Sequence, residues 1–171
     1  VSDQNSGDQA NNGLQLGVFN GVTIAQTGTT DGSGNLLTTE AGSTTTFTVV
    51  LDATPTADVT VSITGLDTTE NSLSGSTLSG TNTLTFNAGN WNTAQTVTVT
   101  GVDDSIVDGD ITTTLSATAN NAGGYAGTET STVTVTNTTD DTNGISITHT
   151  GTTDGSGNLL TTEAGGSSTF T

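Results

Sequence analysis

Acidic side chains are the main candidates for chemistry in this chain, and they occur in clusters. Four aspartates fall within eight residues. The candidate ligands are Asp103, Asp104, Asp108 and Asp110 in that stretch, the pair Asp140 and Asp141, and Glu40 in the sequence TTEAG. Calcium takes about six to eight oxygen ligands and accepts carboxylates and carbonyls from flexible loops, which suits clustered aspartates on a glycine-containing loop. The pattern fits a bound cation and fits equally a solvated acidic loop that keeps the chain soluble.

The charge balance limits the possible partners. The sequence contains 17 acidic residues, one His and neither Lys nor Arg, giving a formal net charge of -17. Mobile or bound cations must offset this charge, because no Lys or Arg in the chain can do so. Nucleic acid and anionic membrane surfaces both require Lys or Arg, so neither is expected as a partner. No apolar run approaches the roughly 20 residues of a membrane span, so we expect no membrane insertion.

Most catalytic sites cannot be built from these residues, and we expect no enzyme. The chain has no Cys nucleophile, no Lys base and no Arg clamp. Any Ser/His/Asp triad would have to use His149, the single His. Paired carboxylates hydrolyse glycosides in other proteins, but one Trp and one Tyr offer few aromatic walls for a sugar pocket.

Two short motifs are weak signals. The stretch DGSGN lacks the Lys and the following helix of a phosphate-binding loop. The triplet Asn137-Thr138-Thr139 fits the N-glycosylation pattern, but it is a single match in a Thr-rich chain. We assign no site to either motif.

An internal repeat organises the chain. The sequence TGTTDGSGNLLTTEAG at residues 27–42 returns unchanged at residues 150–165, which is an offset of 123 residues (150 − 27). The match extends backward from NGVTIAQTG to NGISITHTG and forward from GSTTTFT to GGSSTFT. Long-period repetition indicates an array in which each unit is one structural module. The repeat also aligns His149 with Gln26, so the module does not need an imidazole at that position.

Alternating apolar and polar residues predict the fold class. In TTTFTVVL the residues Phe47, Val49 and Leu51 lie on one face, and DVTVSIT and TVTVTGV alternate in the same way. Strands of four to eight residues, with turns roughly every ten, predict an all-β, antiparallel β-sandwich of about seven strands. No segment has the 3.6-residue period of a helix.

The repeat predicts three parts. Residues 1–20 form a polar tail in which Leu14, Leu16 and Val18 alternate, either as a lead-in packed on its own module or as a strand donated to a neighbour. Residues 21–141 form a complete module. Residues 142–171 are the truncated start of a second repeat, too short to bury a sandwich core alone. Either the chain continues beyond residue 171, or another copy completes the fragment by strand addition.

The order of these motifs resembles the Calx-beta repeats and their relatives in very large bacterial surface proteins. The matching features are TTEAG, a TFTVVL-type strand, NWNTAQTVTVTGVDD, VDGD and a DD linker, over about residues 21–141. The resemblance implies an immunoglobulin-like β-sandwich with calcium at one end, near the junction to the next domain. It assigns the same seven acids as ligands: Glu40, Asp103, Asp104, Asp108, Asp110, Asp140 and Asp141. The family's mid-domain Gly-x-Asp-aromatic segment has no counterpart in residues 65–80, and the family's further carboxylate at the end of the central acidic stretch is replaced by Ile111.

These observations predict a structural repeat unit of an extracellular bacterial filament or giant surface protein. Its partners would be copies of itself, joined as tandem modules, by strand addition between subunits, or both, with calcium as the rigidifying cofactor. A chain without Lys or Arg offers trypsin-like proteases no cleavage site, which fits an extracellular or cell-surface location. The alternative is a calcium-dependent adhesion or carbohydrate-binding module, with glycans bound by a loop such as residues 65–80. A third hypothesis is ice or mineral contact through Thr96, Thr98 and Thr100.

Overall fold

The structure, a computed structural model, describes residues 20–171, so the candidate donor strand around Leu14 lies outside the described residues. Within that range the chain forms nine strands: β1 (Val22–Gln26), β2 (Leu36–Thr39), β3 (Thr44–Leu51), β4 (Val59–Thr64), β5 (Asn71–Ser74), β6 (Thr83–Phe86), β7 (Gln95–Gly101), β8 (Ile111–Ala119) and β9 (Thr130–Thr138). These are two more than the seven or so expected. The additional strands are β2 and β5, whose sequences LLTT and NSLS do not alternate apolar and polar residues as the other strands do.

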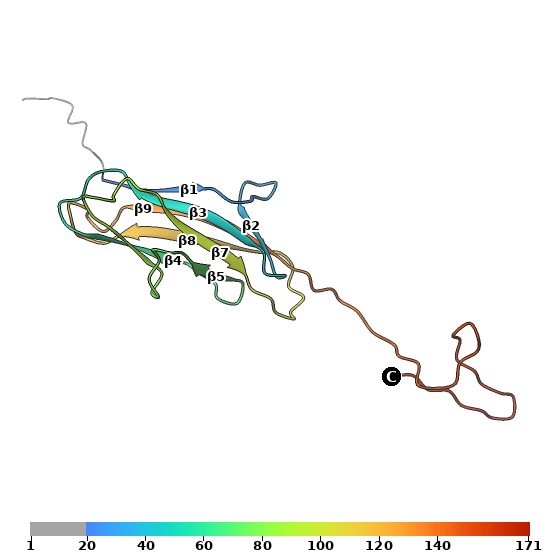
Figure 1. The fold of residues 1–171 in the computed structure, drawn as a ribbon. Helices are drawn as coiled ribbons and strands as arrows, with labels where there is room; N and C mark the ends of the chain where they lie inside the picture. Colours follow the sequence, from blue (N-terminus) through green and yellow to red (C-terminus); the bar gives the residue numbers. More distant parts are fainter. Residues whose placement is uncertain (1–19) are drawn as a thin grey trace, which may run out of the picture. The chain divides into compact units, whose positions relative to one another are not determined.

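The strands form two sheets that pack face to face (Figure 1). One has the order β1-β3-β7-β5 and the other the order β2-β9-β8-β4-β6. Read as immunoglobulin strands, β1-β3-β7-β5 corresponds to A-B-E-D and β9-β8-β4 to G-F-C, so the predicted immunoglobulin-like sandwich is confirmed. The fold is not wholly antiparallel, because β2 pairs in parallel with β9. No helix occurs in residues 20–171, so none there is long and apolar enough to cross a membrane.

The core lies between the sheets and is built from the alternating positions that the sequence predicts. Phe47, Val49 and Leu51 of β3 are at most 1% exposed. Strands β4, β7, β8 and β9 point apolar side chains into the same cluster. The Thr residues between them face outward, because successive side chains of a strand point to opposite faces.

A tight turn centred on Asp31 carries the chain from β1 in one sheet to β2 in the other. The Asp31 Oδ1 atom accepts hydrogen bonds from the backbone N–H groups of Ser33 (2.8 Å) and Asn35 (2.9 Å). Its Oδ2 atom accepts from Asn35 Nδ2 and from Thr136 Oγ1 on β9, both at 3.0 Å. The turn is therefore closed on itself and also tied to the strand with which β2 pairs.

The described chain divides into two compact units between Asp140 and Asp141. The second unit repeats the local structure of the first: Asp154 Oδ1 accepts from the N–H groups of Ser156 (2.8 Å) and Asn158 (2.9 Å). Its large apolar side chains, however, are mostly exposed, as at Ile145, Ile147 and Leu160. Phe170 is 63% exposed, whereas Phe47, 123 residues earlier (170 − 47), is fully buried. The local sequence is therefore enough to form the turn at Asp154. Burial of Phe170 would require partner strands equivalent to those that cover Phe47, and residues 141–171 do not include them.

Acid should weaken the fold partly through Asp31. The backbone hydrogen bond from Asn35, with further bonds from the Asn35 side chain, Ser33 and Thr136, lowers the pKa of Asp31 below its ordinary value of 3.8. A lowered folded-state pKa means that the carboxylate stabilises the fold above pH 3.8 and that this contribution is lost as the pH falls through the folded-state pKa. We expect Asp31→Asn to lower the melting temperature at pH 7 and to converge with the unaltered chain in acid. Melting curves from pH 2 to 7 measure the difference, and parallel curves would contradict the expectation.

The two equivalent phenylalanines should differ sharply in their contribution to stability. We expect Phe47→Ala to lower the free energy of unfolding of the first unit by about 3–5 kcal/mol, because it leaves a cavity in the core. Phe170→Ala should change it by no more than about 0.5 kcal/mol, because that side chain is already in solvent. Denaturant titration followed by the fluorescence of Trp91, the only Trp, reports on the first unit because Trp91 packs against its core. Equal losses in the two variants would contradict the expectation.

Candidate metal centre

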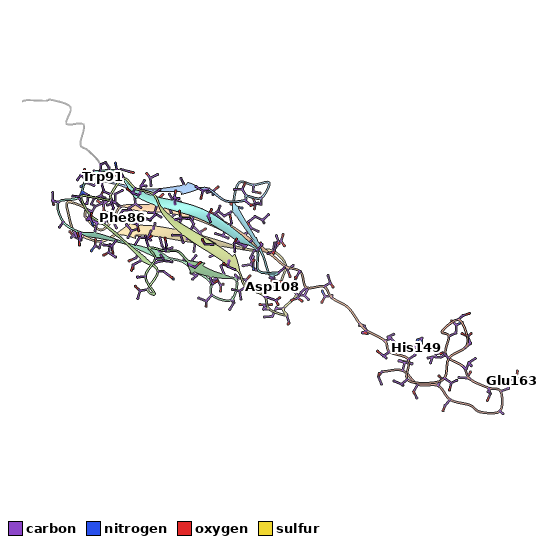
Figure 2. All side chains as sticks on the ribbon, in the orientation of Figure 1. Phe86, Trp91, Asp108, His149 and Glu163 are labelled. Carbon is purple, nitrogen blue, oxygen red and sulfur yellow. The ribbon has the colours of Figure 1, made fainter. Side chains whose placement is uncertain are left out.

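Three carboxylates meet at one end of the sandwich. Glu70, just before β5, and Asp104 and Asp108, in the loop between β7 and β8, each offer one oxygen, and these oxygens lie within 4.8 Å of one another. Figure 2 shows Asp108 at the opposite end of the sandwich from Phe86 and Trp91. We call these three residues the carboxylate cluster.

Glu70 is the buried member of the carboxylate cluster. It is only 4% exposed, and its Oε2 atom accepts one hydrogen bond, at 3.3 Å, from Asn137 Nδ2. A buried carboxylate is costly unless a positive charge compensates it, and the sequence contains no Lys or Arg. An all-oxygen group of this kind suits a hard divalent cation such as calcium. The residues present therefore fit the predicted cofactor.

A second pair of carboxylates holds the chain where it leaves β9. Glu40 is 2% exposed, and its Oε2 atom accepts from Thr139 Oγ1 (3.0 Å) and from the N–H of Asp140 (3.1 Å). Asp110 Oδ1 accepts from the N–H of Thr139 at 3.2 Å. Residues 139 and 140 are thus fixed by acids from the end of β2 and from the loop before β8. We call this arrangement the linker clamp.

The structure brings together two of the seven predicted ligands, Asp104 and Asp108, with one acid that the sequence analysis missed. Glu70 lies in residues 65–80, where the family resemblance offers no matching segment. The available signal was a lone acid directly before the short strand β5, NSLS, at the point where the loop rejoins the sheet. The strand NSLS contains a single apolar residue, so no periodicity marked it or the acid that precedes it.

The other five predicted ligands lie outside the carboxylate cluster. Glu40 and Asp110 form the linker clamp. Asp140 is exposed and contributes its N–H to that clamp, and Asp103 is also exposed. Asp141 is the first residue of the second unit. Their assignment as metal ligands stays a prediction.

The glycosylation triplet has a structural role instead. Asn137 is 1% exposed, and its amide nitrogen donates to Glu70 Oε2 (3.3 Å) and to the carbonyl of Val102 (3.4 Å). A side chain so enclosed offers no acceptor for a sugar in the folded chain.

Comparison with known proteins shows only distant likenesses. No family model and no curated protein matches this sequence. One similar solved structure is SSP-19, an MSP-domain-like protein of Caenorhabditis elegans, with 12% identity over 61% of this chain and 92% of that one, and a TM-score of 0.38. Another is the apo form of the Calx CBD1 domain, with 15% identity over 70% of this chain and 98% of that one, and a TM-score of 0.33. Likenesses this distant establish neither a family nor a ligand for this chain.

Neutralising Glu70 should have opposite effects without and with calcium. In a chelator we expect Glu70→Gln to raise the free energy of unfolding by about 1–2 kcal/mol, because the amide keeps the shape and removes the buried charge. With calcium present, the unaltered chain should gain more stability than the variant. Thermal unfolding in chelator and in millimolar calcium chloride measures both effects.

Glu129→Gln is the matched control for this measurement. Its carboxylate accepts backbone N–H bonds from Ala126 and Gly127 and lies outside the carboxylate cluster. We expect this change to leave the calcium-dependent rise in melting temperature intact. Destabilisation by Glu70→Gln in the chelator would show that the charge of Glu70 is already compensated without metal.

Proposed function

We propose that this chain is a structural repeat unit of an extracellular bacterial filament or giant surface protein, stiffened by calcium at the end of the module that leads into the next unit. The observation that carries the proposal is the state of the second unit. It has the turn and the hydrogen bonds of a module's first strands, yet Ile145 is 93% exposed and Phe170 63% exposed. A segment of this kind needs the remaining strands of a module.

The first unit shows which strands would cover that surface. Leu36 pairs in parallel with Val135 of β9, and Phe47 pairs with Val97 of β7. The equivalent residues of the second unit, Leu159 and Phe170, therefore require strands of the β7 and β9 type. A tandem module supplies them from the same polypeptide, and strand addition supplies them from another copy. In both cases the partner is a further module of the same kind.

Calcium would act on the junction between modules. Bound at the carboxylate cluster, it would offset the negative charge of Glu70, Asp104 and Asp108 and join the start of β5 to the loop between β7 and β8. That loop also carries Asp110, which bonds the N–H of Thr139 in the linker clamp. Ordering the loop would therefore order the first residues of the linker. Because such binding favours the folded state, it also stabilises the module by mass action.

The same composition supports an exported, non-catalytic role. A formal charge of -17 keeps separate copies apart unless cations are present, which suits assembly controlled by calcium. The absence of Lys and Arg removes the cleavage sites of trypsin-like proteases, an advantage outside the cell. We propose no catalytic residue and no nucleic-acid or membrane partner.

A calcium-dependent adhesion module is the second candidate, and two exposed apolar residues favour it. Ile106 is 61% exposed and Val107 44% exposed, and both lie between the aspartates of the carboxylate cluster. Apolar side chains presented by a metal-holding loop are available to a partner surface. Carbohydrate is the weaker choice of ligand, because Tyr125 is buried and Trp91 packs against the core. Selective binding on a glycan array would favour the carbohydrate form of this alternative.

Electron microscopy of the purified chain with calcium and with a chelator tests the proposed function. We expect filaments in calcium that soften, fray or dissolve in chelator. Filaments indifferent to chelator would keep the structural role and remove the cation from it. Monodisperse particles in both conditions would exclude the filament and favour the adhesion module. In calcium, filaments of Glu70→Gln should be softened, frayed or dissolved, as we expect for the unaltered chain in chelator. Filaments of Glu129→Gln should match those of the unaltered chain in both conditions.

A further inference from the structure

The inward-facing positions of three strands become polar at the end of the sandwich that holds the carboxylate cluster. Leu36 of β2 is followed on the same face by Thr38, and Val135 of β9 by Asn137. Thr38 is fully buried, Asn137 is 1% exposed, and Asn71 of β5 is 2% exposed. Buried amides and hydroxyls destabilise a fold unless they are hydrogen-bonded, so their partners determine what they do.

These buried groups form a hydrogen-bonded series that crosses from one sheet to the other. Asn71 Nδ2 donates to Thr38 Oγ1 (3.1 Å), and Thr38 Oγ1 donates to Asn137 Oδ1 (2.9 Å). Asn137 Nδ2 then donates to Glu70 Oε2 at 3.3 Å. Because Thr38 donates to the oxygen of the amide, the NH₂ group of Asn137 faces the carboxylate. Every bond in the series points toward Glu70, so each strengthens the next.

Asn137 also holds the start of the acidic loop. Its Nδ2 donates to the carbonyl of Val102 at 3.4 Å, and the N–H of Val102 donates to the carbonyl of Glu70 at 2.8 Å. Val102 directly precedes the loop that carries Asp104 and Asp108. One side chain therefore touches the buried ligand and the residue from which the other two ligands depart.

Gly101 makes this close approach possible. A Cβ atom at Gly101 would lie 2.6 Å from Asn137 Oδ1 and 2.1 Å from the carbonyl oxygen of Thr39. Both separations are too short for any side chain. Only glycine fits at position 101, the last residue of β7. Its missing side chain lets the Asn137 amide lie directly against the strand that leads into the acidic loop.

We infer that Asn137 is a positioning residue for the cation site: it orients the Glu70 carboxylate and fixes the start of the loop that supplies Asp104 and Asp108. This inference rests on the proposed calcium site. Groups that orient metal ligands without touching the metal typically contribute about 10–100-fold to metal affinity. A buried amide with a purely structural role would contribute to stability and leave the affinity unchanged.

Gln95 provides the matched control. It is also a buried amide, 6% exposed, and its Nε2 donates to the carbonyl of Thr85 at 2.9 Å. It lies at the beginning of β7, whereas Gly101 ends that strand beside Asn137. Removing Gln95 therefore removes a buried amide without altering the surroundings of Glu70.

The test compares calcium affinity with stability in the full chain. Calcium chloride is titrated calorimetrically into metal-free unaltered chain, Asn137→Ala and Gln95→Ala, and each is melted in chelator. We expect both variants to melt below the unaltered chain in chelator. Only Asn137→Ala should bind calcium more weakly, by about 10-fold or more.

A second variant keeps the test decisive if Asn137→Ala does not fold. Thr38→Val preserves shape and leaves Asn137 against Glu70, but it removes the hydroxyl that orients the amide. We expect it to weaken calcium binding less than Asn137→Ala and more than Gln95→Ala. Unaltered calcium affinity in Asn137→Ala, or in Thr38→Val where the first variant is unfolded, would overturn the inference and leave the calcium site standing. An unaltered chain that binds no calcium would overturn the site and the inference together.

Discussion

Burying carboxylates in a chain without Lys or Arg is the constraint on which the acidic end of this molecule depends. Glu40 and Glu70 are 2% and 4% exposed, and no Lys or Arg is available to pair with either. Neutral groups donate hydrogen bonds to both carboxylates. The hydroxyl of Thr139 and the N–H of Asp140 donate to Glu40, and the side-chain amide of Asn137 donates to Glu70. Hydrogen bonds to neutral donors reduce the cost of a buried charge but do not cancel it. The remaining charge is what gives a cation its role in the proposed function.

The two ends of the sandwich are closed by different physical means. At the acidic end the core finishes in the polar layer of Thr38, Asn71 and Asn137. At the other end Tyr125, 2% exposed, fills the gap, and its hydroxyl donates to the carbonyl of Ala53 at 2.9 Å. Burial raises the pKa of Tyr125 above its ordinary value of 10.0, so the hydroxyl stays a donor at physiological pH. One end is therefore closed by an aromatic side chain, and the other by a layer of neutral polar groups that contacts the buried carboxylate of Glu70.

The sequence was sufficient for the features that repeat along it and insufficient for those that depend on distant pairing. Alternation located the inward faces of β3, β4 and β7, and with them the core residues Phe47 and Val97. It did not reveal that β2 lies parallel to β9, because Leu36 and Val135 are separated by 99 residues (135 − 36) and nothing local marks the contact. Within the carboxylate cluster, the dense run of aspartates indicated Asp104 and Asp108. Glu70 was missed because a single acid beside a four-residue strand has no local pattern, and only the fold brings it to the other two.

The parallel pairing of β2 with β9 also has a mechanical consequence. The chain enters β2 at Leu36 and leaves β9 at Thr138, and the two strands run side by side in the same direction over four residue pairs. Opposite forces applied at Leu36 and at Thr138 would therefore slide β2 and β9 past each other along their length, whereas β1, which precedes β2, would pull on its pairing with β3. The hydrogen bonds between β2 and β9 would share the load at once, instead of opening one after another as they would at the end of a hairpin. The pairing that places β2 in the second sheet would thus put the hydrogen bonds between β2 and β9 under shear when the chain is pulled.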